Sequence, residues 1–210
     1  VQVIGTVHNI LPHERMFYDD YFFARIYKWS NVLIFHTEGI LETFIAKFSI
    51  PKNKFKIISH YYDPVTIEQQ KEIPEKMLFF GNIRHYKGLE LLIEAIKLLP
   101  SKKGWELCVA GRPEYDMSAL KIQTENYENI HWRDSFIDDD DVGELFNQHG
   151  IVVMPYKKID TSGLLYLAQS YGKLIIAPRM AIFEETIDHM VNGLLFEPNN
   201  VKDLSAMIQF

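Results

Sequence analysis

The sequence contains one cysteine, Cys108, in 210 residues. A single thiol excludes an intrachain disulfide framework, so a reducing compartment is the default expectation. Cys108 lies inside an apolar segment and is expected to be a core residue. Apolar runs of the roughly 18 to 20 residues that cross a bilayer are missing, as is a recognisable signal peptide. We therefore expect a cytoplasmic protein.

An excess of positive charge is also missing, since 22 basic and 28 acidic residues give a net charge of −6. This balance argues against a general nucleic-acid binder, although it leaves room for a local basic site. The Walker phosphate loop, the GxGxxG dinucleotide motif and the GxSxG nucleophile elbow are absent too. The function must therefore be sought in other patterns.

Apolar strand-like segments alternate with helical patterns along the chain. Strands are expected at 1–7, 31–36, 54–59, 77–80, 105–110, 130–132, 151–154, 174–177 and 194–196, with helices between them. This alternation predicts an α/β fold in which helices cover parallel sheets. The polar segment 66–76 lacks apolar periodicity and predicts a domain linker. Because the sequence opens within a strand and closes within a helix, we expect a fragment of a longer protein.

The first candidate site lies between a buried strand and an amphipathic helix. Met77–Phe80 predicts the strand, Gly81 ends it, and the helix starts near Gly88. Arg84 and Lys87 lie in the loop between them. The carboxyl end of a parallel strand beside a helix N-terminus favours phosphate, which Arg and Lys bind through charge-assisted hydrogen bonds. Spacing alone is equally compatible with two solvated cations.

A second candidate is the polar loop that enters the helix predicted from Gly163. Its backbone N–H groups at Thr161, Ser162 and Gly163 are available for an anion, but the same residues also suit an ordinary N-cap.

A third candidate is the loop with His8, His13 and Glu14, which could provide an acid/base set or metal ligands, or simply be a solvated loop.

Two further patterns are interpreted structurally. The four acids at 138–141 precede a helix expected at 142–148, where they complement the helix dipole, so we expect no metal site there. The helix predicted at 14–29 is rich in aromatic residues, namely Phe17, Tyr18, Tyr21, Phe22 and Phe23. We expect these rings to pack in a core, while peripheral contact with the inner face of a membrane stays open as the alternative.

Five segments, in order, resemble GT-B glycosyltransferases of family 4, retaining enzymes that move a sugar from a nucleotide diphosphate donor. The segments are TVHNILPHE, FFGNIRHYKGLELLIEAI, LCVAGRP, TSGLLYLAQSYGKLIIAP and FEETIDHMVNGLLFEPNNVKDLS. The resemblance covers nearly the whole chain. It implies two Rossmann-like domains: the C-terminal half of an acceptor-side domain at 1–70, a linker at 71–76, and a nucleotide-sugar donor domain at 77–210, truncated at its end.

The resemblance also implies roles for individual residues. Arg84 and Lys87 would neutralise the donor diphosphate, and His8 would face the transferred sugar. The distal phosphate would be held by Thr161, Ser162, Gly163 and Leu164, and the base pocket would be lined by Phe136 and Ile137. No metal or cofactor is implied, because the donor, a UDP- or GDP-sugar, is a substrate and cationic side chains carry its charge.

The sequence departs from the family pattern at several positions. The second of two glutamates that commonly flank the donor helix is replaced by Leu167, and the first, near Ile159 or Asp160, is missing as well. Asn82 stands where a basic residue is usual, and Met180 and Ala181 replace a glycine pair. The expected function is retaining transfer of a hexose to a glycan or lipid-linked acceptor in cell-surface polysaccharide synthesis. The alternative is a degenerate nucleotide-sugar-binding or scaffold module of a polysaccharide assembly complex.

Overall fold

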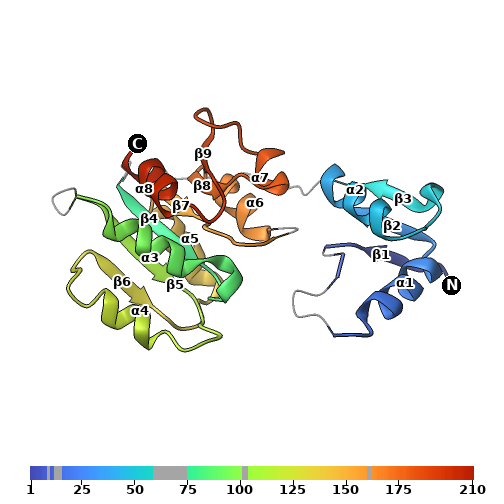
Figure 1. Cartoon of the computed structure of the whole chain (residues 1–210), viewed down its shortest axis with the longest axis horizontal. Helices are drawn as coiled ribbons and strands as arrows, with labels where there is room; N and C mark the ends of the chain where they lie inside the picture. Colours follow the sequence, from blue (N-terminus) through green and yellow to red (C-terminus); the bar gives the residue numbers. More distant parts are fainter. Residues whose placement is uncertain (9, 12–15, 59–74, 101–103, 160–161) are drawn as a thin grey trace. The chain divides into compact units, whose positions relative to one another are not determined.

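The computed structural model describes residues 1–8, 10–11, 16–58, 75–100, 104–159 and 162–210 (Figure 1). The chain divides into two compact units, one over 1–61 together with 160–162 and the other over 62–159 and 163–210. Each unit contains its own parallel sheet. The predicted α/β fold is confirmed. Most of the predicted linker lies outside the described residues, and the second sheet already begins at Lys76.

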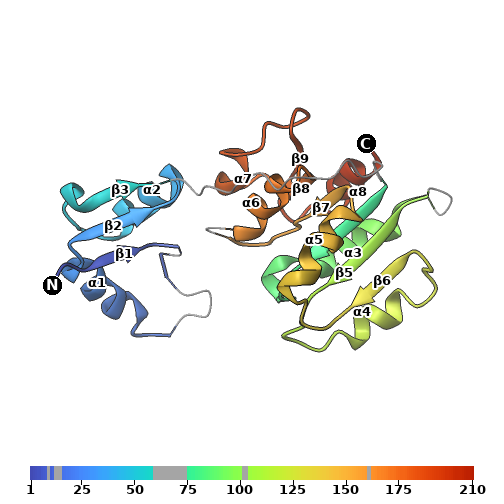
Figure 2. The same cartoon turned by 180° about the vertical axis from the view of Figure 1, so that it is seen from behind.

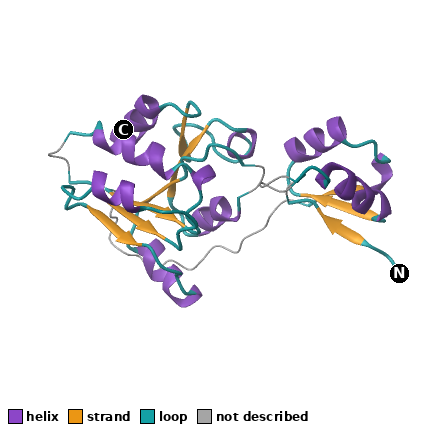
Figure 3. Ribbon diagram, turned by 60° about the horizontal axis from the view of Figure 1, so that its bottom comes forward, coloured by secondary structure: helices purple, strands orange, loops and turns teal. Residues whose placement is uncertain are grey.

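Unit 1 has a three-stranded parallel sheet in the order β1-β2-β3, with two crossover helices (Figure 3). Its elements are β1 (Ile4–Thr6), α1 (Asp19–Trp29), β2 (Val32–Phe35), α2 (Glu38–Lys47), η1 (Lys52–Lys54) and β3 (Phe55–Ile57). Aromatic side chains fill the core: the ring of Phe44 lies 4.9 Å from that of Phe35 and 5.0 Å from that of Tyr27. Both helices thus pack on the same face of the sheet.

Helix α1 differs from the sequence expectation at two points. It begins at Asp19, whereas the helix was predicted from Glu14, and residues 12–15 lie outside the described chain. The predicted aromatic core is wrong for four of its five rings, because Phe17, Tyr18, Tyr21 and Phe22 are exposed and Phe23 alone is half-buried. The helical periodicity explains this. Phe23 and Tyr27 lie on the face of α1 that packs toward the sheet, and the other four rings lie on faces that do not.

Unit 2 contains a six-stranded parallel sheet in the order β6-β5-β4-β7-β8-β9, shown from behind in Figure 2. The strands are β4 (Lys76–Phe80), β5 (Glu106–Ala110), β6 (Ile130–Arg133), β7 (Ile151–Val153), β8 (Leu174–Pro178) and β9 (Gly193–Phe196). The helices are η2 (His85–Lys87), α3 (Leu89–Lys97), α4 (Ser118–Gln123), α5 (Asp139–Asn147), α6 (Gly163–Ser170), α7 (Ala181–Glu184) and α8 (Val201–Gln209).

The order of the strands reverses in the middle of this sheet. From β4 the chain moves outward through β5 to β6, then returns to β7 on the other side of β4 and moves outward again to β9. The carboxyl ends of β4 and β7 thus meet at a topological switch point, where open α/β sheets hold their ligands. Both strands are short and apolar, as expected for strands buried on both faces.

Helices cover both faces of the larger sheet, and the alternation along each strand sets the two cores. In β4, Met77 and Phe79 pack against α3 and α8, whereas Leu78 packs toward α5, α6 and α7. Cys108 is buried in β5, as predicted, and its burial raises the pKa of the thiol. Within the described ranges, no helix is both long and apolar enough to span a bilayer.

Helix α5 begins at Asp139, three residues earlier than predicted. Its first turn contains Asp139, Asp140 and Asp141, the position in which carboxylates complement the helix dipole. Of the residues that the structure describes, no three histidine, cysteine or acidic side chains gather as a metal site would require. The acidic run therefore has a structural explanation as a helix start.

Candidate functional site

The site is built on the loop that joins β4 to α3. Gly81 leaves the strand with a φ of 92°, and Gly88 enters α3 with a φ of 72°, both in the left-handed region that glycine adopts without strain. Between them η2 turns the chain back toward the sheet. As a result, the side chain of Lys87 returns to the end of the strand that precedes it.

Lys87 is a buried cation, with 9% of its surface exposed. Its Nζ donates a hydrogen bond to the carbonyl oxygen of Phe80 at 3.2 Å and lies 5.8 Å from the ring centroid of Tyr156. Burial, and after it the nearby charge of Arg84, lower the pKa of Lys87 to about 8, while the carboxylate of Glu114 acts in the opposite direction. Within the described part of the chain no carboxylate forms an ion pair with this ammonium, so a nearby anion would favour its charged form.

Arg84 lies three residues earlier and points to a different neighbour. Its Nε is buried and lies 2.7 Å from Oε2 of Glu114, in the loop after β5. That loop is fixed to the first one, because the backbone N–H of Glu114 donates to the carbonyl of Ile83 at 3.0 Å. The Arg84 guanidinium also lowers the pKa of the Glu114 carboxyl. The side chain of Tyr86 also interacts with the Arg84 guanidinium, whose planar group of donors suits bidentate binding of an anion.

The loop after β7 packs directly onto this loop. The backbone N–H of Lys157 donates to the carbonyl of Tyr86 at 2.7 Å. A Cβ at Gly88 would lie 1.9 Å from the carbonyl oxygen of Pro155, so the two backbones meet where only glycine fits. The two loops at the switch point therefore form one packed assembly.

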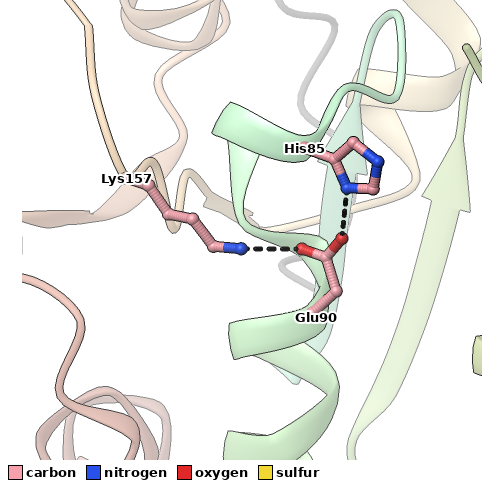
Figure 4. A network of polar contacts seen from close by, with 3 residues as sticks. All are labelled: His85, Glu90 and Lys157. Atoms are coloured by element: carbon pink, nitrogen blue, oxygen red, sulfur yellow. Dashed lines mark hydrogen bonds and ion pairs between the residues drawn. The ribbon is translucent and has the colours of Figure 1, made fainter. Parts of the chain in front are cut away.

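Glu90, in the first turn of α3, adds a side-chain bridge between the same loops (Figure 4). Its Oε1 lies 3.0 Å from Nδ1 of His85 and its Oε2 lies 3.2 Å from Nζ of Lys157. Burial opposes ionisation of Glu90, but its own backbone N–H and then His85 and Lys157 outweigh it, so the pKa of the carboxyl is lowered. The ring of Tyr115 stacks on His85 at 3.8 Å, which fixes the far side of the bridge.

Replacing Glu90 by Gln is expected to lower the free energy of unfolding by about 1 kcal/mol, because partly exposed ion pairs contribute roughly 0.2–1 kcal/mol each and two are lost. Chemical denaturation would measure this. Glu94→Gln is the matched control, since Glu94 lies one turn along α3 and pairs only with Lys97 in the described contacts, at 2.7 Å. Equal effects of the two substitutions would contradict a bridging role for Glu90.

A cavity of about 460 Å³ opens beside Gly81, within the range of small-molecule sites. Its floor is formed by the turns after β4 and β5, where a Cβ at Gly111 would lie 2.2 Å from the carbonyl oxygen of Gly81. Its walls include Phe80, Asn82, Arg112, Phe136, Ile137, Asp139, Val142, Leu167 and Tyr171. Lys87 adjoins this floor, because its Nζ lies 2.8 Å from where a Gly81 Cβ would be.

The structure brings together part of the predicted set. Arg84 and Lys87 share one loop, and Phe136 and Ile137 lie in the wall of the adjacent cavity. Leu167, at the position of the missing second glutamate, lines the same cavity and contributes an apolar side chain there.

The other predicted residues lie elsewhere. Ser162 is buried, Gly163 begins α6 and Leu164 is half-buried against the core beneath that helix. Thr161 lies outside the described residues. His8 belongs to unit 1, where its ring lies 4.9 Å from that of His36. The structure therefore describes His8 within unit 1.

Several residues at the site were not predicted, among them Glu90, Arg112, Glu114 and Tyr156. Arg112 and Glu114 follow the glycine turn after β5, so the rule that ligands gather at the carboxyl ends of parallel strands could have identified them. Tyr156 and Glu90 act through contacts with residues distant in sequence, for which the sequence pattern carries no signal.

Comparisons with known proteins bear on the family and on the fold. The sequence profile of the family described as glycosyl transferases group 1 matches residues 66–210. A GDP-mannose:glycolipid 4-beta-D-mannosyltransferase of Xanthomonas campestris is 26% identical over 179 residues, which cover 84% of this chain and 50% of that protein. The chain thus spans about half the length of the curated relatives it matches.

Solved structures share the fold at low sequence identity. HepE from Anabaena, in complex with UDP-glucose, superposes with a TM-score of 0.80 at 16% identity, over 99% of this chain and 62% of that one. Sucrose-phosphate synthase from Thermosynechococcus elongatus superposes with a TM-score of 0.78 at 16% identity, over 99% of this chain and 58% of its own.

Proposed function

Because the chain belongs to the group 1 glycosyl transferases, we propose that it is part of an enzyme that transfers a hexose from a nucleotide diphosphate sugar to a glycan or lipid-linked acceptor. The name of the Xanthomonas relative supports a hexose and a glycolipid acceptor, and the UDP-glucose bound to HepE supports a nucleotide-sugar donor. Cell-surface polysaccharide synthesis is the setting that such acceptors suggest.

The observation that carries this proposal is the buried ammonium of Lys87 at the switch point, with Arg84 in the same loop. Breaking the bond between sugar and diphosphate leaves negative charge on the departing phosphate oxygens. Cations that are already in position stabilise this charge without reorganising solvent. Lys87 supplies a point charge, and Arg84, oriented by Glu114, supplies a bidentate donor.

The rest of the donor would contact other parts of the chain. The cavity walled by Phe136 and Ile137 is large enough for a nucleoside, and its position next to Gly81 would place the base beyond the diphosphate. The start of α6, at Ser162, Gly163 and Leu164, with Thr161 before it, would hold the distal phosphate through backbone N–H groups. His8 would face the sugar from the acceptor-side unit.

Calorimetry of the intact protein with UDP and with GDP tests this proposal, followed by assays of donor hydrolysis and transfer. Binding of one nucleotide together with turnover supports the enzyme.

The second candidate, a degenerate binding or scaffold module, is favoured by Leu167 in the cavity wall and by Met180 and Ala181. Nucleotide binding without turnover would favour a binding module, and stable association with a partner without nucleotide affinity would favour a scaffold.

The family resemblance predicts that the anomeric configuration of the sugar is retained. The coupling constant of the anomeric proton, measured by NMR in the first product formed, would check this. An inverted product would overturn retention while leaving the assignment as a glycosyltransferase intact.

Nucleotide affinity is expected to fall as the pH rises through about 8. The pKa of Lys87 is lowered to about 8, so the amine is charged below that pH and neutral above it. Each pH unit above 8 should therefore weaken diphosphate binding by up to roughly tenfold, with proton uptake on binding. Calorimetry at pH 7 and pH 9, in buffers of different ionisation enthalpy, measures both. Lys87→Arg should remove the dependence, and equal affinities of the unaltered protein at both pH values would contradict the prediction.

A further inference from the structure

The outward face of α1 is lined by aromatic side chains. Tyr18 is 48% exposed, Tyr21 68%, Phe22 57% and Trp29 69%. At about 100° of turn per residue, these positions fall within one arc of roughly 100°, while Tyr27 lies on the opposite side and packs in the core. An exposed arc of this size on a small unit is unusual, because such rings normally supply core burial.

The same arc contains cations and no acids. Arg25 lies within it, 5.5 Å from the ring centroid of Tyr21 and 5.3 Å from that of Trp29, and its Nη1 donates to the hydroxyl of Tyr21 at 2.7 Å. Lys28 is exposed at its margin. The outward face of α1 is therefore positive in a chain whose net charge is −6.

The two acids of α1 are directed away from this face. Asp19 is buried and accepts a hydrogen bond from the backbone N–H of Met16 at 2.7 Å. Asp20 lies about half a turn from the aromatic arc and pairs with Lys47 of α2 at 2.8 Å. Both negative charges are thus engaged elsewhere in unit 1, and in the contacts that the structure describes no carboxylate pairs with Arg25 or Lys28.

We propose that the outward face of α1 docks on the surface of a lipid bilayer that carries anionic headgroups. Tyrosine and tryptophan favour the headgroup level, where an apolar ring can be buried while its polar edge stays hydrated. Arg25 and Lys28 suit the same level, because each basic residue near an anionic surface contributes roughly 1 kcal/mol. The charge of the face indicates the binding partner. Because the chain as a whole is acidic, it would be repelled by an anionic membrane except where a locally positive face approaches it.

This docking goes beyond the proposed function and rests on unit 1 alone. A helix of 11 residues that lies in the interface would anchor weakly and reversibly. If the acceptor is lipid-linked, docking would keep the enzyme beside it, but the attachment does not depend on the identity of the acceptor.

Co-sedimentation of the intact protein with vesicles tests the docking, using phosphatidylcholine alone and phosphatidylcholine mixed with phosphatidylglycerol. Binding is expected only to the mixed vesicles, and it should weaken as salt is raised. The double variant Phe22→Ser, Trp29→Ser should lose about tenfold in partition, as should Arg25→Glu, Lys28→Glu. The matched control is Ile122→Ser, since Ile122 on α4 of unit 2 is 65% exposed.

A second measurement locates the contact. With Trp105 and Trp132 replaced by Phe, brominated lipids should quench the fluorescence of Trp29. Absence of vesicle binding, or binding that leaves Trp29 unquenched, would overturn the proposal, as would a partner protein or another segment of the intact chain that covers the face. UDP or GDP binding by the same variants should be unchanged, so a failure of docking is distinguishable from a failure of the proposed function.

Discussion

Replacing Lys87 by alanine in the intact protein is expected to lower glycosyl transfer by roughly 10²-fold or more, because a preorganised charge on the leaving group contributes on that scale. The loss should appear in kcat as well as in kcat/KM, since the charge on the diphosphate grows as the bond breaks. Steady-state assays over a range of donor concentrations measure both. Lys97→Ala, on the exposed face of α3, is the control and should leave transfer unchanged.

The stability of the same variants provides a sharper test. The lowered pKa of Lys87 means that burying its charged amine lowers the free energy of unfolding at neutral pH. Lys87→Met keeps most of the volume and removes the charge, so its free energy of unfolding should rise by on the order of 1–3 kcal/mol while transfer is lost. Stability gained as activity is lost would identify a site residue held under electrostatic strain. Normal turnover of Lys87→Met would exclude Lys87 from catalysis.

Gly88→Ala is expected to destabilise unit 2 by about 3 kcal/mol or more and to abolish nucleotide binding. Two effects add: the φ of 72° is unfavourable for alanine, and its Cβ would lie 1.9 Å from the carbonyl oxygen of Pro155. The loops after β4 and β7 would have to separate, which would uncover Lys87. Chemical denaturation and calorimetry with UDP or GDP measure the two consequences.

Two comparisons separate these effects. Gly88→Asn should be nearly as harmful, because asparagine tolerates the left-handed conformation but still brings a Cβ against Pro155. Gly143→Ala, within α5, should be neutral or stabilising, since its Cβ would meet only the hydroxyl of Tyr171, at 3.4 Å, and alanine favours a helix. A harmless Gly88→Ala would mean that the two loops are not locked together.

The sequence predicted the loop of the site well, because local rules determine it. An apolar strand, a glycine, two cations and an amphipathic helix occur where expected, and Gly81 and Gly88 do adopt conformations that favour glycine. The spacing of Arg84 and Lys87 did not predict their surroundings. Glu114 and Tyr156, which hold them, come from other loops, and such tertiary contacts leave no trace in a local pattern.

The aromatic helix shows a different limit of sequence reasoning. Periodicity defines arcs on a helix, but in α1 both arcs carry large rings, so the pattern alone did not indicate which one faces the sheet. The structure selects the narrower arc with Phe23 and Tyr27. The acids offered a clue that the prediction did not use, since Asp19 and Asp20 both lie outside the arc that holds Tyr18, Tyr21 and Trp29.

The close approach of Gly81 and Gly111 determines where the cavity can distinguish one ligand from another. At this approach the lining is main chain, because a Cβ at Gly111 would lie 2.2 Å from the carbonyl oxygen of Gly81. Peptide groups present the same N–H and C=O to every ligand, so this part of the lining can bind a ligand but does not distinguish one ligand from another. If the cavity holds the donor base, as proposed, its selectivity must arise from the side chains that line it, of which Asn82, Arg112 and Asp139 are polar. Exchanging these three residues is then expected to change the preferred nucleotide while the main chain at Gly81 and Gly111 stays as it is.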